Sequence, residues 1–353
     1  MKRILTLFTI ISLIVLSNNT LYSQVGGKGI YEFLNLPNSA RIASVGGDFL
    51  PIKDNDITLS LANPSIINAE MNNQLALSFV DYFSDINYGF AMYSRTFEKF
   101  GSFTGAMQYI NYGKFDYADI SGEKQGTFKA AEYAFNIGWG RQLDSTFSIG
   151  ANFKTIYSVF ESYKSFGMAV DIAGTYYNEK NLLTVSLIAK NIGLQLKPYY
   201  SENTEPLPFE LQLGLSKKFK HLPFRYYILL NHLEKWDLTY EDPLNPTDEV
   251  DPFTGEVKTK GGFDKFMDKS MRHVIIGGEL IFTKNFSIRI GYNYQRRKEM
   301  KVDSKISTVG FSWGFGLRIS KFRFSYARSR YHLVGSPNFI TITTNLSDFY
   351  SKR

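Results

Sequence analysis

The chain has 353 residues, with 40 Lys and Arg against 33 Asp and Glu, and a formal net charge of +7. It has no cysteine, which excludes disulfide scaffolds, thiolate metal sites, Cys nucleophiles and lipid anchoring through an N-terminal Cys. A mean hydropathy of −0.19, with no apolar run of about 18 residues beyond Leu16, excludes a helical membrane protein. The aromatic content of 16% is too high for a disordered chain. The basic residues are scattered, so no nucleic acid partner is expected.

The first 23 residues have the pattern of a cleaved secretory signal peptide. Lys2 and Arg3 form a positive start, an apolar run extends from Ile4 to Leu16, and a polar stretch ends at the small residue Ser23. The apolar run is too short for a membrane anchor. We therefore expect an exported protein whose mature part begins after residues 1–23.

From residue 74 onward, apolar and polar residues alternate with a period of two. Between residues 286 and 295, for example, Phe286, Ile288 and Ile290 alternate with Ser287, Arg289 and Gly291. Such alternation places successive side chains on opposite faces of a sheet. Fourteen segments have this pattern: 74–81, 86–97, 102–111, 130–142, 146–158, 166–178, 182–191, 208–218, 224–236, 271–282, 286–297, 305–318, 322–331 and 338–347.

The lengths of these segments and of their connections favour a membrane barrel. Most segments have the ~9–11 residues that a tilted strand needs to cross a bilayer. When the segments are numbered in chain order, the connections that follow even-numbered segments are short turns. Several connections that follow odd-numbered segments are long, namely 112–129, 192–207 and 237–270. Outer-membrane barrels show this asymmetry, with short periplasmic turns and long outer loops. The sequence therefore predicts an all-β fold: a transmembrane outer-membrane β-barrel of about 14 antiparallel strands over residues 74–353.

The more polar face of the strands is predicted to line the lumen, because an Arg facing lipid at the bilayer midplane costs about 2–4 kcal/mol. Its charged residues are Lys154, Glu210, Glu279, Arg289, Arg318 and Arg323, and its glycines are Gly150, Gly214, Gly277, Gly291, Gly310 and Gly314. These small residues leave space inside the barrel. Residues 24–73, which lack alternation but are too apolar for a solvated tail, are the expected occupant and are called the hatch segment below.

The hatch segment resembles a known family. The resemblance is carried by Gly26, Gly27, Gly29, Tyr31, Phe33, Leu34, Pro37, Ser39, Ala40, Arg41, Gly46, Gly47, Asp54, Asp56, Asn63 and Pro64. Together with the signal peptide and the barrel, this block resembles the PorV/PorQ family, which belongs to the FadL-like group of fourteen-stranded barrels. Ser65 departs from the Ala that is common there, and the chain does not end in the usual terminal aromatic residue.

The resemblance implies a non-enzymatic component of the type IX secretion system in a Bacteroidetes-type outer membrane. It would anchor a PorZ-like surface protein within an attachment complex that contains PorU and PorV and joins cargo to lipopolysaccharide. The alternative function is a FadL-like channel for hydrophobic small molecules. The predicted lumenal residues are mostly small, polar or charged, which favours the anchor slightly.

Three expectations concern particular sites. Asp48, Asp54 or Asp56 of the hatch segment is predicted to pair with the lumenal arginines; the alternative is hydrated lumenal charges. The loop at 237–270 is the candidate docking surface for a partner, because it holds the apolar residues Phe253, Phe263 and Phe266; the alternative is a solvated loop. The four histidines are far apart and no nucleophile motif occurs, so neither an enzyme, a metal site nor a cofactor is expected.

Overall fold

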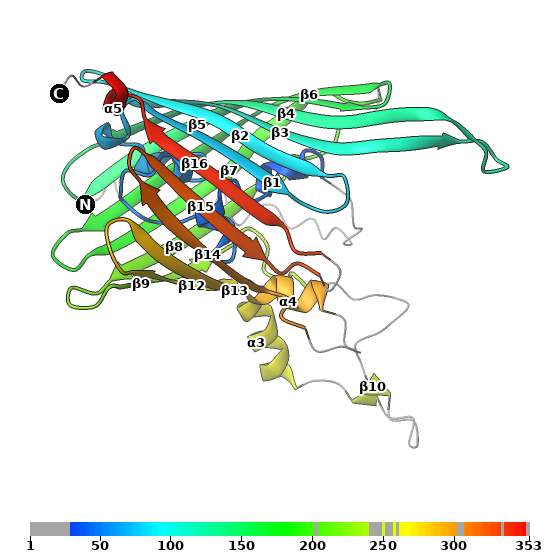
Figure 1. The fold of residues 1–353 in the computed structure, drawn as a ribbon. Coiled ribbons are helices and arrows are strands. Elements are labelled where there is room, and N and C mark those ends of the chain that lie inside the picture. Colours follow the sequence, from blue (N-terminus) through cyan, green and yellow to red (C-terminus); the bar gives the residue numbers. More distant parts are fainter. Residues whose placement is uncertain are drawn as a thin grey trace, which may run out of the picture.

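The computed structural model describes residues 29–200, 204–239, 249–250, 257–258, 261–301, 307–332 and 335–350. The predicted signal peptide, Gly26, Gly27 and Phe253 lie outside the described residues. The described chain forms a closed antiparallel barrel of 14 strands, as the alternation predicts (Figure 1). The barrel strands are β1 (Gln74–Asp81), β2 (Asn87–Phe97), β3 (Gly101–Ala118), β4 (Lys124–Gln142), β5 (Phe147–Phe160), β6 (Tyr163–Asn178), β7 (Leu183–Lys197), β8 (Glu210–Lys218), β9 (Phe224–Leu230), β12 (Val274–Ile281), β13 (Phe286–Asn293), β14 (Phe311–Ile319), β15 (Phe322–Ser329) and β16 (Asn338–Asn345).

Each strand pairs with its neighbours in the chain, and β1 pairs with β16 to close the sheet. Closure satisfies the backbone groups that an open edge would leave unpaired in lipid. At one end, on the left in Figure 1, the connections have two to five residues. We call this the periplasmic end and the opposite end the outer end, because short turns face the periplasm in bacterial barrels.

The outer surface of the barrel is apolar. Phe135 and Ile137 of β4, and Phe311 and Trp313 of β14, are 45–53% exposed although they are large hydrophobic residues. Their neighbours on the other face, such as Asn136 and Ser312, are buried. This is the pattern of a barrel that faces lipid outside and holds polar groups inside.

Within the described residues, no helix is both long and apolar enough to cross a membrane.

The longest hairpin differs from the expected loop at 112–129. β3 and β4 continue pairing as far as Ala118 and Lys124, so most of that stretch is strand. Phe115 and Phe128 face each other across the hairpin with ring centroids 5.2 Å apart. Aromatic pairs of this kind stabilise a two-stranded ribbon, so the hairpin extends beyond its neighbours at the outer end (Figure 1).

The strand predicted at 286–297 is shorter than expected. β13 ends at Asn293, and helix α4 (Tyr294–Met300) begins at the next residue. The side chain of Asn293 caps this helix by accepting a hydrogen bond from the backbone N–H of Arg296. Asn is among the best N-cap residues. The strand predicted at 224–236 similarly ends at Leu230.

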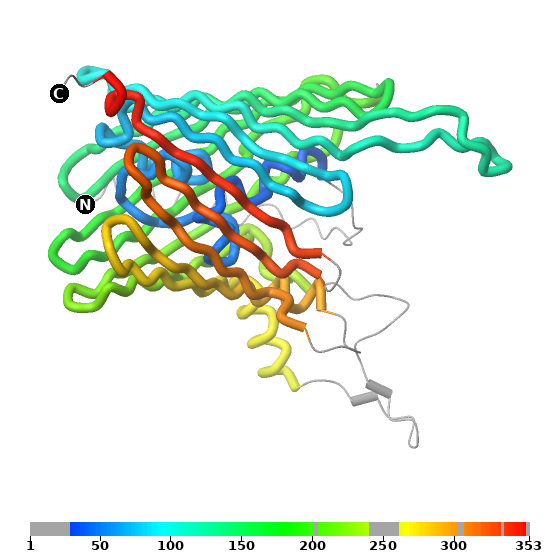
Figure 2. The backbone as a smooth tube through the Cα atoms, in the orientation of Figure 1, coloured from blue at the N-terminus to red at the C-terminus, as the bar shows by residue number. Residues whose placement is uncertain are grey.

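Short elements complete the fold. The hatch segment contains η1 (Glu32–Asn35), α2 (Ala40–Ala43), η2 (Ile57–Leu59), η3 (Pro64–Ile66) and η4 (Ala69–Met71), and the outer loops hold β10 (Glu249–Val250), β11 (Val257–Lys258) and α3 (Gly262–Arg272), with α5 (Ser347–Tyr350) near the C-terminus. Ser39, Asp56, Asn63 and Asn68 each cap one short helix of the hatch segment with a side-chain oxygen. Because such side chains favour helix starts and turns over helix interiors, the segment folds as a chain of single turns. Figure 2 shows these turns, in blue, within the barrel.

Candidate functional site

The lumen is filled by the hatch segment, which packs against the inward glycines. A Cβ atom at Gly291 would lie 2.0 Å from the backbone of Val45, and one at Gly150 would lie 2.3 Å from the backbone of Pro64. Gly214, Gly277 and Gly314 likewise face Phe49, Val45 and Ser44. The sequence-based expectation that these glycines leave room for the segment is therefore confirmed at five positions. Gly310 instead adopts a positive φ of 91° in the turn before β14.

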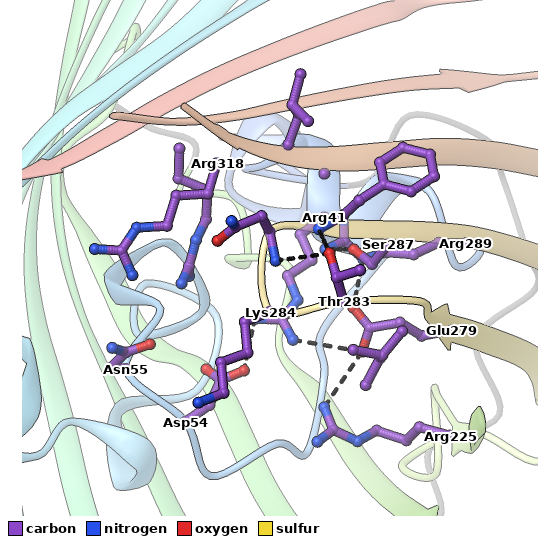
Figure 3. Close-up of a pocket in the computed structure, with 16 residues that line it drawn as sticks. Arg41, Asp54, Asn55, Arg225, Glu279, Thr283, Lys284, Ser287, Arg289 and Arg318 are labelled. Atoms are coloured by element: carbon purple, nitrogen blue, oxygen red, sulfur yellow. Dashed lines mark hydrogen bonds and ion pairs between the residues drawn. The ribbon is translucent and has the colours of Figure 1, made fainter. Parts of the chain in front are cut away.

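Arg41 is the centre of an ion-pair network at the periplasmic end of the lumen (Figure 3). The side chain projects from α2, is 7% exposed, and its Nη1 atom lies 2.7 Å from Asp54 and 2.9 Å from Asp56. Its Nη2 atom lies 3.5 Å from Glu279 of β12. Burial by itself raises the pKa of Asp56, but Arg41, Arg323 and a hydrogen bond from Thr58 lower it below the ordinary value. Arg41 thus joins two parts of the hatch segment to the barrel wall.

Three side chains of the barrel wall also contact the carboxylate of Glu279. It lies directly across from Arg289 of β13 and Arg225 of β9 in the sheet register, and the closest nitrogen–oxygen distances are 2.7 and 3.3 Å. The Tyr227 hydroxyl donates to it at 2.8 Å. A buried carboxylate needs this many partners because its desolvation is costly.

The prediction that carboxylates of the hatch segment pair with the lumenal arginines of the strands was wrong. Asp54 and Asp56 pair with Arg41 of their own segment rather than with the strand arginines, and Asp48 accepts a hydrogen bond from Asn231 at 2.7 Å. Sequence reasoning also missed Arg225. Its position, one residue after Phe224 on an alternating strand, places it on the inward face and could have identified it.

Arg318 and Arg323 lie on the same inward face at the periplasmic rim. They are directly opposite each other on β14 and β15. Both line a cavity of about 160 Å³, together with Arg41, Glu279 and Arg289. The four lumenal charges predicted from the sequence are therefore brought together at one end of the barrel.

The remaining motif residues fix the path of the hatch segment. The side-chain amide of Asn63 donates to Ser186 at 3.2 Å, and the backbone N–H of Ala40 donates to Thr341 at 2.9 Å. The carbonyl of Pro37 accepts a hydrogen bond from Tyr88 at 3.2 Å. Gly46 and Gly47 have positive φ angles of 112° and 96°, which suit glycine at the turn after α2. Ser39 caps α2, and Gly29 precedes η1.

The outer half of the lumen holds a buried apolar cluster beside inward polar residues such as Gln108, Glu132 and Ser158. The sequence-based interpretation of the lumen as mostly small, polar or charged did not predict this cluster. Tyr31, Phe33 and Leu34 of the hatch segment are buried there. They belong to one cluster with inward side chains of the wall: Val80, Tyr88, Ile110, Ala134, Ile156 and Phe339. The alternation in the sequence does not distinguish an inward apolar residue from an outward one at a strand end.

A second cavity of about 270 Å³ lies at the outer end, lined by residues that include Asp48, His232, Arg296 and Tyr331. Burial, followed by the charge of Glu210, raises the pKa of Asp48 to about 6. Burial alone would lower the pKa of His232, but its hydrogen bond to Glu234 and the nearby carboxylates raise that pKa to about 9. The guanidinium of Arg296 lies 4.0 Å from the ring centroid of Tyr331. This mouth therefore holds charged groups of both signs.

The candidate partner loop presents an apolar patch on α3. Phe263 is 75% exposed, Phe266 is 53% exposed, and the ring of Trp236 lies 5.6 Å from that of Phe266. The helix projects from the outer end of the barrel (Figure 1). Two of the three predicted loop residues are thus exposed; Phe253 lies outside the described residues.

Among the described residues, no group of three or more His, Asp or Glu side chains is arranged to hold a metal ion. The cavities described above offer ion pairs and hydrogen bonds instead.

Comparisons with known proteins identify the fold. Neither the models of protein families nor the curated proteins gave a match. Among solved structures, the Pseudomonas putida toluene transporter TodX has a TM-score of 0.54 and 11% identity, covering 89% of this chain and 99% of that chain. The Ralstonia pickettii toluene transporter TbuX has a TM-score of 0.52 and 10% identity, covering 88% and 99%.

At these identities the likeness shows the fold alone. The chain therefore has a FadL-like fold, as the sequence predicts: a closed barrel of 14 strands. The barrel and its apolar outer surface point to a bacterial outer membrane.

Proposed function

We propose that the chain is an outer-membrane channel that admits small hydrophobic molecules. The observation that supports this proposal best is the apolar cluster in the outer half of the lumen. Sites for such ligands are lined mostly by apolar and aromatic side chains, and the inward residues of this cluster supply such a lining. The two structurally similar proteins are described as toluene transporters, which agrees with this chemistry.

The hatch residues in this cluster are held by apolar packing together with individual hydrogen bonds. Tyr31 shares a hydrogen bond with Ser165 at 2.5 Å, and the backbone N–H of Ile30 donates to the carbonyl of Pro206 at 3.3 Å. The side-chain amide of Asn191 donates to Asn35 of η1 at 2.8 Å, and Phe33 and Leu34 pack against wall residues. A hydrophobic molecule offers the wall the same kind of contact, so it competes directly with η1 for this space.

Uptake of a labelled aromatic hydrocarbon by cells that lack other such channels tests the proposal. We expect the full chain to raise the uptake rate, and the double variant Phe33→Ala/Leu34→Ala to raise it further by opening space within the apolar cluster. Leu59→Ala, which removes a buried side chain from the middle of the hatch segment, is the matched control and leaves uptake near that of the unchanged chain. Uptake equal to that of cells without the chain would contradict the proposal.

Deletion of residues 26–66 provides a second measurement. We expect it to increase the single-channel conductance in planar bilayers, because it removes the segment that fills the lumen. Unchanged conductance would mean that the hatch segment does not obstruct the pore.

A second candidate function is the anchoring of a surface protein, which the exposed aromatic patch of α3 favours. Apolar side chains gathered on a projecting helix suit a protein interface. In the terms of the PorV/PorQ resemblance, the chain would be a PorQ-like component of a type IX secretion system in a Bacteroidetes-type outer membrane. A PorZ-like protein would be its direct partner, with PorU, PorV and lipopolysaccharide in the same attachment complex.

Co-purification from the native membrane tests the anchor. Replacing 243–262 with a Gly/Ser linker, or introducing Phe263→Ala/Phe266→Ala, is expected to release the partner. The control is Phe115→Ala/Ile120→Ala on the β3–β4 hairpin, where both side chains are also exposed. Full retention of the partner by the α3 variants would mean that the partner docks elsewhere on the protein.

The two functions are separable by deletion of the whole gene. A channel predicts slower growth on hydrophobic substrates, whereas an anchor predicts loss of sorted cargo from the cell surface.

A further inference from the structure

We propose that the periplasmic mouth of the barrel is a binding site for a phosphate group. The site is the cavity of about 160 Å³ described above, which we call the basic cavity (Figure 3). Its lining includes the basic side chains Arg41, Arg225, Lys284, Arg289, Arg318 and Arg323.

The charge of this lining is unbalanced. The six basic side chains face only two acidic ones, Asp54 and Glu279. Asp56, which pairs with Arg41 just outside the lining, adds a third carboxylate and still leaves three basic groups in excess. A ligand with two or more negative charges in this small volume would balance that excess.

Arg318 and Arg323 contribute most to this excess of positive charge. Like charges directly opposite on neighbouring strands destabilise a sheet, and these two are paired across β14 and β15. Within the described part of the chain, neither has a carboxylate at ion-pair distance, whereas Arg41, Arg225 and Arg289 each do. Their direction into the lumen also keeps them away from the lipid that surrounds the barrel.

The inner part of the cavity holds buried donors that lack partners. Arg289 is 5% exposed, yet its Nη1 atom has no hydrogen-bond partner among the described residues, and the same is true of Nε of the buried Arg41. An unsatisfied buried donor on a charged group is costly. Gly316 leaves room for the Arg289 guanidinium, because a Cβ atom at position 316 would lie 2.9 Å from Nη2 of Arg289.

These donors suit a phosphate group. Guanidinium groups recognise phosphate oxygens through paired N–H donors, and here they approach from the hatch segment and from four strands. Arg318 and Lys284 are exposed at the rim, and Arg41 and Arg289 are buried behind them. The arrangement draws an anion in from the periplasm and holds it against the base of the hatch segment.

Calorimetric titration of the full purified chain in detergent with pyrophosphate tests this site. We expect saturable binding that weakens as salt rises, and at least a tenfold loss of affinity in Arg318→Ala/Arg323→Ala. The matched control is Arg95→Ala/Lys99→Ala, which removes two exposed positive charges at the same end of the barrel and is expected to change affinity less than twofold. No binding by the unchanged chain, or an equal loss in both variants, would overturn the proposal.

The phosphate could belong to a soluble periplasmic ester or to a phospholipid headgroup, and the membrane environment distinguishes these sources. In nanodiscs of phosphatidylglycerol, a headgroup in the site would compete and weaken pyrophosphate binding by the unchanged chain relative to binding in a phosphate-free maltoside detergent. If the affinity is the same in the nanodiscs and in the detergent, the ligand is the soluble ester.

Discussion

The two ends of the lumen hold the hatch segment by different physical means. At the periplasmic end, Arg41 forms buried ion pairs with carboxylates of its own segment and of the barrel wall. At the outer end, Tyr31, Phe33 and Leu34 pack against apolar side chains of the wall. Ion pairs depend on fixed geometry, whereas apolar packing is non-directional.

This difference indicates which end can move. Separating Arg41 from its partners leaves charges buried without compensation. Separating η1 from the outer half of the wall exposes apolar surface, which another apolar molecule can cover at little cost. We therefore expect the periplasmic end to fix the hatch segment and the outer end to yield first.

The largest effect is expected from Arg41→Met, which removes the ionic attachment and leaves Asp56 and Glu279 short of a partner. Breaking a buried ion pair costs about 3–5 kcal/mol, so the free energy of opening of the hatch segment should fall by about that amount. Hydrogen exchange of the amides around α2 measures it. Arg95→Met, at an exposed position, is the control; equal protection in both variants would contradict a special role for the network.

A middle-sized effect is expected where the segment meets the glycines of the wall. Gly291→Ala forces a methyl group against the backbone of Val45, and overpacking of this kind costs about 1–3 kcal/mol. Gly174→Ala is the matched control, because a Cβ there meets nothing within 4 Å. Thermal unfolding in detergent should separate the two variants, and equal melting temperatures would argue against close packing of the segment.

A pH-dependent effect is expected at the outer mouth. The pKa of Asp48 is raised to about 6, so the folded state favours the protonated carboxyl, and that contribution to stability is lost as the pH rises through 6. Asp48→Asn keeps a residue that tolerates the positive φ of 81° and should stabilise the protein at pH 8 but not at pH 4.

Melting temperatures at the two pH values measure this effect. Asp85→Asn, in the exposed link between β1 and β2, is the control and should show no such pH dependence. A stabilisation by Asp48→Asn that is equal at both pH values would exclude titration of Asp48 as the cause.

The smallest effect is expected from Tyr31→Phe. It removes the hydrogen bond to Ser165 but keeps the ring, and Ser165 still accepts from Gln195 and donates to the carbonyl of Lys197. A loss of about 1 kcal/mol in the opening free energy is expected. A loss as large as that of Arg41→Met would mean that polar contacts hold the outer end as firmly as the ion pairs hold the periplasmic end.

The sequence by itself determined the barrel. Alternation with a period of two depends only on which side chains face lipid and which face the lumen, and that choice is made locally by solvation. It therefore predicted all fourteen strands, the short periplasmic turns and the inward position of Arg289, Arg318 and Arg323. The run of inward glycines also predicted that another segment would fill the lumen.

Only the tertiary structure decided how that segment is held. The pairing of Asp54 and Asp56 with Arg41 depends on the path of the hatch segment, which has no repeating pattern from which to predict it. The long β3–β4 hairpin depends on cross-strand aromatic contacts, and the apolar cluster in the outer half of the lumen depends on which strand ends meet η1. These are contacts between residues far apart in the chain. Their energies depend on burial and distance in the folded protein, which a local sequence pattern does not contain.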